Sequence, residues 1–175
     1  MNNYTEDLLV EKPTIELLKE LGWKHLNCFD EKFGEGGTLG RETTNEVVLV
    51  SKLRPALKKL NPDLPDELIQ LVINEITKNR SVQGLVDANR EVYKLLKDGV
   101  KVKLHTANED KIETIKVIDW DNPENNDFFL ASQFWITGEI YKRRADLVGF
   151  VNGMPLVFIE LKASHERLEN AFEKN

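Results

Sequence analysis

Two apolar runs separated by an Asn-Gly pair constrain this chain more than any other feature of its sequence. The runs cover residues 146–151 and 156–161, and Asn152-Gly153 lies between them. Such a pair is typical of a β-hairpin, because both residues tolerate the left-handed backbone that a tight turn requires. Both runs are too apolar to have one face in water, so we expect a sheet that is covered on both sides there.

The charged residues at the ends of these runs are unusual, because burying an ion costs free energy unless the ion is paired or bound to a metal. Asp146 opens the first run, and Glu160 and Lys162 close the second. A strict two-residue turn would pair Asp146 with Ile159 and would put Glu160 on the other face. A three-residue loop, or a bulge in one strand, would place Asp146 directly opposite Glu160. We therefore predict that the hairpin is not a simple two-residue turn.

Two carboxylates a few ångströms apart at the rim of a sheet suit a hard cation such as Mg²⁺. The backbone carbonyl of Leu161 is a further candidate ligand, because Leu161 lies between Glu160 and Lys162. The ammonium group of Lys162 would orient an attacking water or stabilise a pentacovalent phosphate. The alternative reading is two solvated acids at strand ends, with Lys162 in a surface ion pair.

Helical patterns dominate the first half of the chain, and strand patterns dominate the second. Helices are expected over residues 5–21 (kinked at Pro13 or beginning near it), 45–60, 64–80 and 87–97, the last capped by Asp87 and ended by Gly99. Strands are expected over residues 100–104, 111–118 and 126–137 and over the two hairpin runs. The glycine-rich residues 34–40 predict a flexible loop. This order predicts an α/β or α+β sheet core in a single domain over residues 1–175, with residues 44–98 as a helical segment before the core strands.

The composition narrows the class of protein further. A formal net charge of −6 argues against a self-sufficient nucleic-acid binder, which would usually carry a basic face. The acidic amino terminus does not resemble a secretory signal, and no apolar run approaches the roughly 20 residues of a membrane helix. The lone Cys28 forms no internal disulfide, so we expect a cytoplasmic protein with a buried or half-buried thiol. A helix is also expected over residues 166–174, and because this pattern reaches the end of the sequence, we expect a fragment of a longer polypeptide.

The hairpin over residues 144–162 resembles the PD-(D/E)xK nuclease superfamily. More narrowly, the chain is similar to the amino-terminal region of the restriction (R) subunit of type I restriction-modification enzymes. The similarity spans nearly the whole chain, and its other matching segments are residues 53–57, 60–62, 89–93, 133–135 and 160–165. The resemblance implies a restriction-endonuclease-like mixed sheet flanked by helices.

The resemblance also implies roles for individual residues. Asp146 and Glu160 would bind Mg²⁺, Lys162 would assist hydrolysis of the DNA backbone, and Glu11 would complete the site, with Glu6 as the alternative. Ala145 stands where the family often has proline before the acid.

Three more residues are candidates for contacts with DNA. Gln133 would touch DNA or the attacking water, although an ordinary strand amide is the alternative. Arg143 and Arg144 would hold phosphates beside the scissile one, although a solvated loop would explain them equally well.

The resemblance implies partners as well: double-stranded DNA and the modification and specificity subunits of the restriction complex. ATP would serve the full-length protein only, since no phosphate-binding Gly-x-x-x-x-Gly-Lys motif occurs in these residues. Two rival hypotheses stay open: a nuclease of the same superfamily from another DNA-processing system, and a non-catalytic docking module with this fold. The sequence does not reveal the DNA site, the position of the cut or the oligomeric state.

Overall fold

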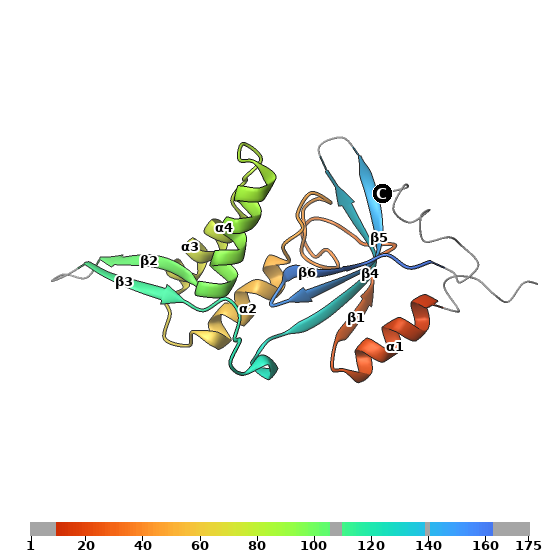
Figure 1. Cartoon of the computed structure of the whole chain (residues 1–175), viewed down its shortest axis with the longest axis horizontal. Helices are drawn as coiled ribbons and strands as arrows, with labels where there is room; N and C mark the ends of the chain where they lie inside the picture. The colour runs from red at the N-terminus through yellow and green to blue at the C-terminus, as the bar shows by residue number, and fades with distance from the viewer. Residues whose placement is uncertain (1–9, 106–109, 139–140, 163–175) are drawn as a thin grey trace, which may run out of the picture. The chain divides into compact units, whose positions relative to one another are not determined.

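The computed structural model describes residues 10–105, 110–138 and 141–162, and the chain forms two compact units (Figure 1). One unit combines Met1–Val47 with Phe128–Asn175, and the other is Val48–Asp127. The expected helix over residues 166–174 lies outside the described residues. The prediction of a single domain over residues 1–175 stays a prediction.

The first unit contains a four-stranded mixed sheet with the order β1-β4-β5-β6. Its strands are β1 (Lys24–Asn27), β4 (Phe128–Thr137), β5 (Lys142–Val151) and β6 (Met154–Ile159). β1 runs parallel to β4, whereas the β4–β5 and β5–β6 pairs are antiparallel. Together with the four α-helices of the described residues, this mixed sheet gives the expected α/β class, compatible with a restriction-endonuclease-like fold.

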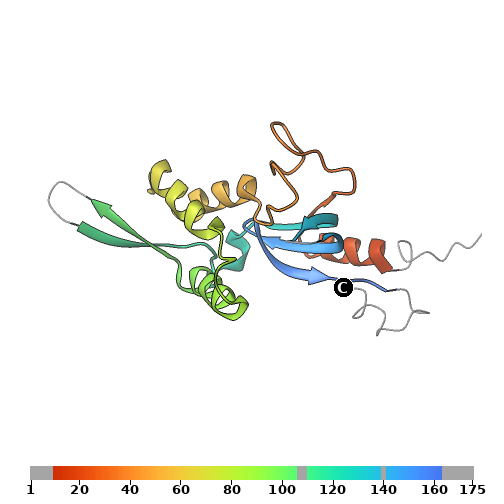
Figure 2. The ribbon, with the colours of Figure 1, turned by 90° about the horizontal axis from the view of Figure 1, so that it is seen from above.

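Helix α1 (Lys12–Glu20) lies beside β1 in Figure 1, and Figure 2 shows this helix along one side of the sheet. Its one buried residue, Ile15, packs against Leu130, Leu147 and Leu161 of the sheet unit. The α-helix begins at Lys12 with Pro13 in its first turn, where the missing N–H of proline is not needed. Residues 5–9 of the longer expected helix lie outside the described residues. It ends before Gly22, whose φ of 91° is a left-handed value that glycine adopts without strain.

Strand β1 is an element that sequence reasoning missed. It is four residues long, its ends are exposed and its centre is only half-buried, so it lacks a clear alternation of apolar and polar residues. Its pairing with β4, from Lys24 opposite Phe129 to Asn27 opposite Ser132, makes the sheet mixed.

The prediction that both hairpin strands are covered on both faces holds for β5 and is wrong for β6. Ala145 and residues 147–150 of β5 are buried. In β6, Leu156, Val157 and Phe158 are exposed. The physical reason is position, since β6 is the edge strand of the sheet and pairs only with β5 among the described strands.

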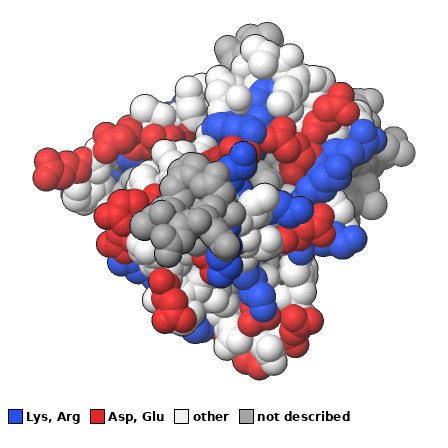
Figure 3. Space-filling model, turned by 90° about the vertical axis from the view of Figure 1, so that its left-hand side faces the viewer, with Lys and Arg blue, Asp and Glu red and all other residues white. Residues whose placement is uncertain are grey.

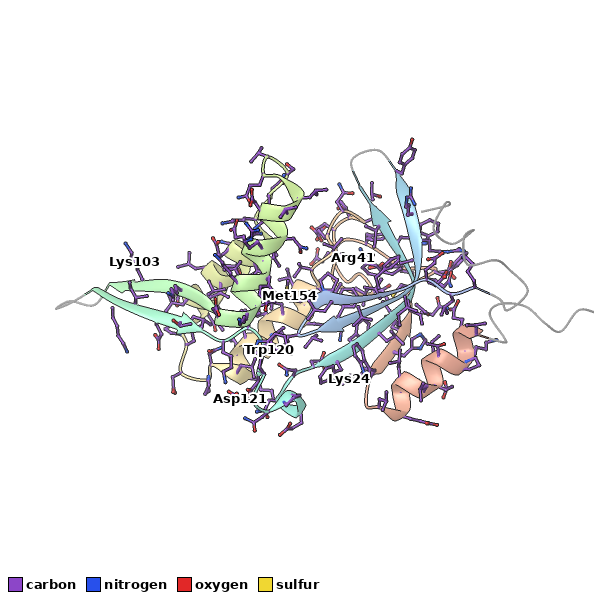
Figure 4. All side chains as sticks on the ribbon, in the orientation of Figure 1. Lys24, Arg41, Lys103, Trp120, Asp121 and Met154 are labelled. Carbon is purple, nitrogen blue, oxygen red and sulfur yellow. The ribbon has the colours of Figure 1, made fainter. Side chains whose placement is uncertain are left out.

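A loop over residues 28–47 joins β1 to the second unit and includes the glycine-rich stretch. Arg41, labelled in Figure 4, holds this loop against the sheet with a side chain only 1% exposed. It forms an ion pair with Glu31, whose side chain is fully buried, and donates from Nη1 to the carbonyl oxygens of Glu46 and Trp135, over 3.0 and 3.2 Å. Its guanidinium lies 3.9 Å from the centroid of the Phe134 ring. The loop is therefore tied to β4 by buried charge-assisted contacts.

The second unit contains three helices and a two-stranded antiparallel sheet of its own. Its elements are α2 (Val50–Leu60), α3 (Asp66–Thr77), α4 (Leu85–Asp98), β2 (Val100–His105), β3 (Asp110–Ile115) and a short 3₁₀ helix, Pro123–Asn125. The expected helices are confirmed, although α2 begins five residues later than predicted. Asp87 does not cap α4, because the helix begins two residues before it and Asp87 lies in the first turn. Gly99 ends α4 as predicted, with φ of 84°.

Candidate functional site

The hairpin between β5 and β6 combines a two-residue turn with a bulge. Val151 pairs with Met154 around Asn152 and Gly153, whose φ values of 51° and 82° are those of a tight left-handed turn. The register then shifts between Phe150 and Gly149, so that Gly149 pairs with Val157. The three-residue loop is thus wrong, and the alternative of a bulge in one strand is confirmed.

The bulge changes which residues face each other at the far end of the hairpin. Beyond it, Leu147 pairs with Ile159, so continuation of this register places Asp146 opposite Glu160. Asp146 also contacts the residue after Glu160 directly: the backbone N–H of Leu161 donates to Oδ2 of Asp146 over 2.8 Å. Without the bulge, Asp146 would face Ile159. The bulge therefore brings the first acid beside the Glu160-Leu161-Lys162 segment.

Gln133 lies in β4 at the position opposite Asp146. The flanking pairs are regular, with Ser132 opposite Leu147 and Phe134 opposite Ala145. Gln133 itself has φ of 55°, a left-handed value that is uncommon for a residue other than glycine in a strand. A backbone irregularity therefore sits in the middle of the sheet, beside the candidate acid.

The side chain of Gln133 reaches the start of α1. Its Nε2 donates to Oε2 of Glu11 over 2.6 Å, and Glu11 is only 9% exposed. Glu11 lies at the cap position, directly before the first residue of α1, and Pro13 lies in the first turn. The alternative candidate, Glu6, lies outside the described residues.

Lys162 contacts the second acid of the hairpin. Its Nζ lies 3.0 Å from Oε1 of Glu160, and both side chains are about four-fifths buried (20% and 22% exposed). This pair is more enclosed than the solvated surface pair of the alternative reading. Three of the candidate metal ligands lie together at the end of the hairpin: Asp146, Glu160 and Leu161. The fourth, Glu11, is hydrogen-bonded to Gln133, which lies opposite Asp146 on β4.

The donor set suits a hard cation, although three acids do not converge here. Among the described residues, no group of three or more His, Cys, Asp or Glu side chains stands close enough together to hold an ion. The oxygen atoms of Asp146 and Glu160, with water, fit Mg²⁺, which usually keeps several waters and binds one or two carboxylates. A carboxylate oxygen of Asp146 that accepts one N–H bond still has lone pairs for a metal.

The predicted DNA contacts fall on exposed positions at the start of β5. Arg143 and Arg144 are exposed, and Arg144 pairs with Trp135 of β4. Gln133 contacts Glu11, which gives its amide a role within the protein; its contact with DNA stays a prediction. Sequence reasoning missed the Gln133–Glu11 bond, because no local pattern marks a contact between residues 122 positions apart.

The mixed sheet, helix α1 beside it and the acids brought together by a bulged hairpin define the class as an α/β protein, compatible with a restriction-endonuclease-like fold. The chain belongs to the family described as "Type I restriction enzyme R protein N terminus", whose model matches residues 3–174. Among the described residues, no helix is long and apolar enough to cross a membrane.

Two curated relatives show the same relationship. The chain is 39% identical over 159 residues to the type I restriction enzyme HindI endonuclease subunit of Haemophilus influenzae, covering 87% of this chain and 14% of that subunit. It is 32% identical to the putative type I restriction enzyme MjaIXP endonuclease subunit of Methanocaldococcus jannaschii, covering 95% of this chain and 16% of the relative. The chain thus spans only a small part of the length of the relatives that it matches.

Proposed function

We propose that this chain is the Mg²⁺-dependent endonuclease region of a type I restriction R subunit, which hydrolyses phosphodiester bonds of double-stranded DNA. The observation that carries the proposal is the bulged register, which sets Asp146 against the Glu160-Leu161-Lys162 segment. Membership of the R-subunit family and relatives named as endonuclease subunits support it.

Each residue of the hairpin end has a distinct task in this proposal. Asp146 and Glu160 would hold Mg²⁺, and the carbonyl of Leu161 would be a further ligand. Glu11, which accepts a hydrogen bond from Gln133, would contact the ion through a water molecule or influence it through Gln133. When bound, the ion lowers the pKa of a water molecule and neutralises charge on the phosphate. The Leu161 N–H fixes the orientation of the Asp146 carboxylate. Lys162, held by Glu160, places a positive charge where a phosphate oxygen becomes more negative.

The partners of the whole protein are part of the proposal. A type I R subunit would work with modification and specificity subunits, which would choose the DNA site, and ATP would drive a motor elsewhere in the full-length protein. A cytoplasmic location is also part of the proposal, and the single cysteine of these residues, which forms no internal disulfide, supports it.

The decisive test is plasmid cleavage by the full-length assembled complex with ATP and Mg²⁺. We expect Lys162→Ala, Asp146→Asn and Glu160→Gln each to lower the cleavage rate by about a hundredfold or more. Lys58→Ala is the matched control, because Lys58 forms an ion pair with Asp66 in the other unit. Unchanged cleavage by Lys162→Ala would overturn the proposed role of this site.

A second measurement separates catalysis from docking. Calorimetric titration with Mn²⁺ should show weaker binding by Asp146→Ala and Glu160→Ala than by the wild type. If the three proteins were indistinguishable, a non-catalytic docking module with this fold would be the better description. ATP-independent cleavage by the complete protein would instead favour a nuclease from another DNA-processing system.

A further inference from the structure

Two aromatic rings lie next to each other beside the candidate site. Trp135 of β4 donates from its indole Nε1 to the carbonyl oxygen of Phe29 over 3.2 Å, which ties the residue two positions after β1 to β4. Phe29 is 49% exposed, a high value for a large apolar ring. We call Phe29 and Trp135 the aromatic shelf.

Two cations rest on this shelf. The Arg144 guanidinium lies 5.1 Å from the centroid of the Phe29 ring and 5.4 Å from that of Trp135. Lys142 Nζ lies 4.7 Å from the centroid of Trp135. These distances are those of cation–π contacts, which hold a cation in place by the negative face of the ring.

The same cations have no other side-chain partners among the described residues. No acid forms an ion pair with Lys142 or Arg144 there, in contrast to lysines such as Lys58 and Lys78. The ring contacts occupy none of the N–H donors of either cation in a conventional hydrogen bond. The two side chains are therefore held by the rings while their donors can bind an acceptor.

The acidic character of the chain limits how an anion could be held at the shelf. The chain as a whole carries a net charge of −6, and Figure 3 shows basic and acidic side chains interspersed on one face of the molecule. Affinity for an anion must therefore come from a local arrangement rather than from a broad basic surface. An arginine and a lysine side by side, with free donors, match phosphate oxygens.

The position of the shelf relative to the candidate site points to the backbone of DNA. Arg144 lies two residues before Asp146 on β5, and its partner Trp135 lies two residues after Gln133 on β4. Two residues of a strand span about 7 Å, so a phosphate at Arg144 would lie close to one at Asp146.

We propose that Arg144 and Lys142, held by the aromatic shelf of Phe29 and Trp135, form a clamp for a DNA phosphate beside the one that is cut. Phe29 and Trp135 are positioning residues in this clamp, and they carry no charge themselves. The inference rests on the proposed function for the identity of DNA as ligand. The clamp itself would bind a phosphate without a metal ion.

The test measures the affinity of the 175-residue chain for a fluorescent DNA duplex by anisotropy, in EDTA and over a series of salt concentrations. For Arg144→Ala we expect about tenfold weaker binding at low salt. The slope of log affinity against log salt concentration should be smaller by about one unit, because one phosphate contact is lost. Phe29→Leu should weaken binding about threefold with an unchanged slope, because it removes no charge. Trp135→Leu should act in the same direction and more strongly.

The control variant is Arg90→Ala, which removes the same charge from an exposed arginine paired with Asp87 in the other unit. Full affinity of Arg144→Ala, or an equal loss in Arg90→Ala, would overturn the clamp. Full affinity of Phe29→Leu would remove the role of the shelf, and since this ring is half exposed, that variant should fold even if Trp135→Leu does not. Binding to an acidic protein surface in place of DNA would show as loss of subunit assembly by Arg144→Ala with unchanged DNA affinity, and would also overturn the proposal.

Failure of the clamp and failure of the proposed nuclease are distinguishable. Because binding is measured in EDTA, it does not depend on the Asp146–Glu160 site. Normal plasmid cleavage by Lys162→Ala would contradict the nuclease site and leave the binding results intact. Normal DNA affinity of Arg144→Ala, with cleavage lost in Lys162→Ala, would contradict the clamp alone.

Discussion

Gln133 donates a 2.6 Å hydrogen bond from its side-chain amide to the carboxylate of Glu11, although 122 positions of sequence separate the two residues. The bond links the start of α1 to the middle of β4, at the position opposite Asp146. Gln133 holds a left-handed backbone there, and such conformations persist only where the surrounding structure enforces them. The bond thus fixes a buried acid relative to the hairpin that carries the other two.

Substitution of Gln133 should separate backbone strain from positioning of Glu11. Gln133→Ala keeps an unfavourable φ, whereas Gln133→Gly relieves it, so the glycine variant should be more stable than the alanine variant by ~1 kcal/mol. Both variants should bind Mn²⁺ more weakly than the wild type, because both lose the bond to Glu11. Urea unfolding and calorimetric titration measure the two effects. Equal stability of the two variants would show that the backbone at Gln133 is not strained.

The buried pair of Arg41 and Glu31 should dominate the stability of the loop over residues 28–47. Removing one partner leaves the other charged and buried, so we expect Arg41→Met to lower the free energy of unfolding by about 3 to 5 kcal/mol. Arg90→Met, at a surface pair, should change it by less than about 1 kcal/mol. Denaturant unfolding followed by circular dichroism gives both values, and a similar small loss in the two variants would contradict the structural role of Arg41.

Cys28 should be chemically silent in the folded protein. Its side chain is fully buried, and burial, reinforced by the negative charge of Glu31, raises the pKa of the thiol to about 12. The reactive thiolate is therefore scarce at neutral pH. We expect no reaction with a disulfide reagent at mildly alkaline pH in the native state and complete reaction in denaturant. Rapid modification of the native protein would contradict the burial of this thiol.

His25 should make stability depend on pH just below neutrality. Burial, helped by the positive charge of Lys19 and opposed by Glu16, lowers the pKa of His25 below its ordinary 6.5. The unfolded chain therefore binds the proton more readily, and the stability that neutral His25 contributes is present above pH 6.5 and is lost as pH falls below it. His25→Gln should flatten this part of the stability profile. Urea midpoints measured across this range test it, and parallel profiles for the variant and the wild type would contradict the lowered pKa.

The sequence by itself determined the elements whose signals are local. Apolar periodicity located α3, the Asn-Gly pair located the hairpin, and Gly99 marked the end of α4. The need to explain the charges at Asp146 and Glu160 even limited the hairpin to a bulge or a longer loop. These features depend on backbone preferences and alternation within a few residues, which a sequence displays directly.

Tertiary structure alone decided the rest, because each remaining feature depends on residues far apart in the chain. It chose the bulge over the longer loop, supplied β1 as a parallel partner of β4, and left β6 exposed at the edge of the sheet. It also brought Gln133 to Glu11 and placed Arg41 against the Trp135 carbonyl, 94 positions away. Such contacts follow from how the whole core packs. A buried polar group costs free energy unless it meets a hydrogen-bond partner, and here the partners come from distant parts of the sequence.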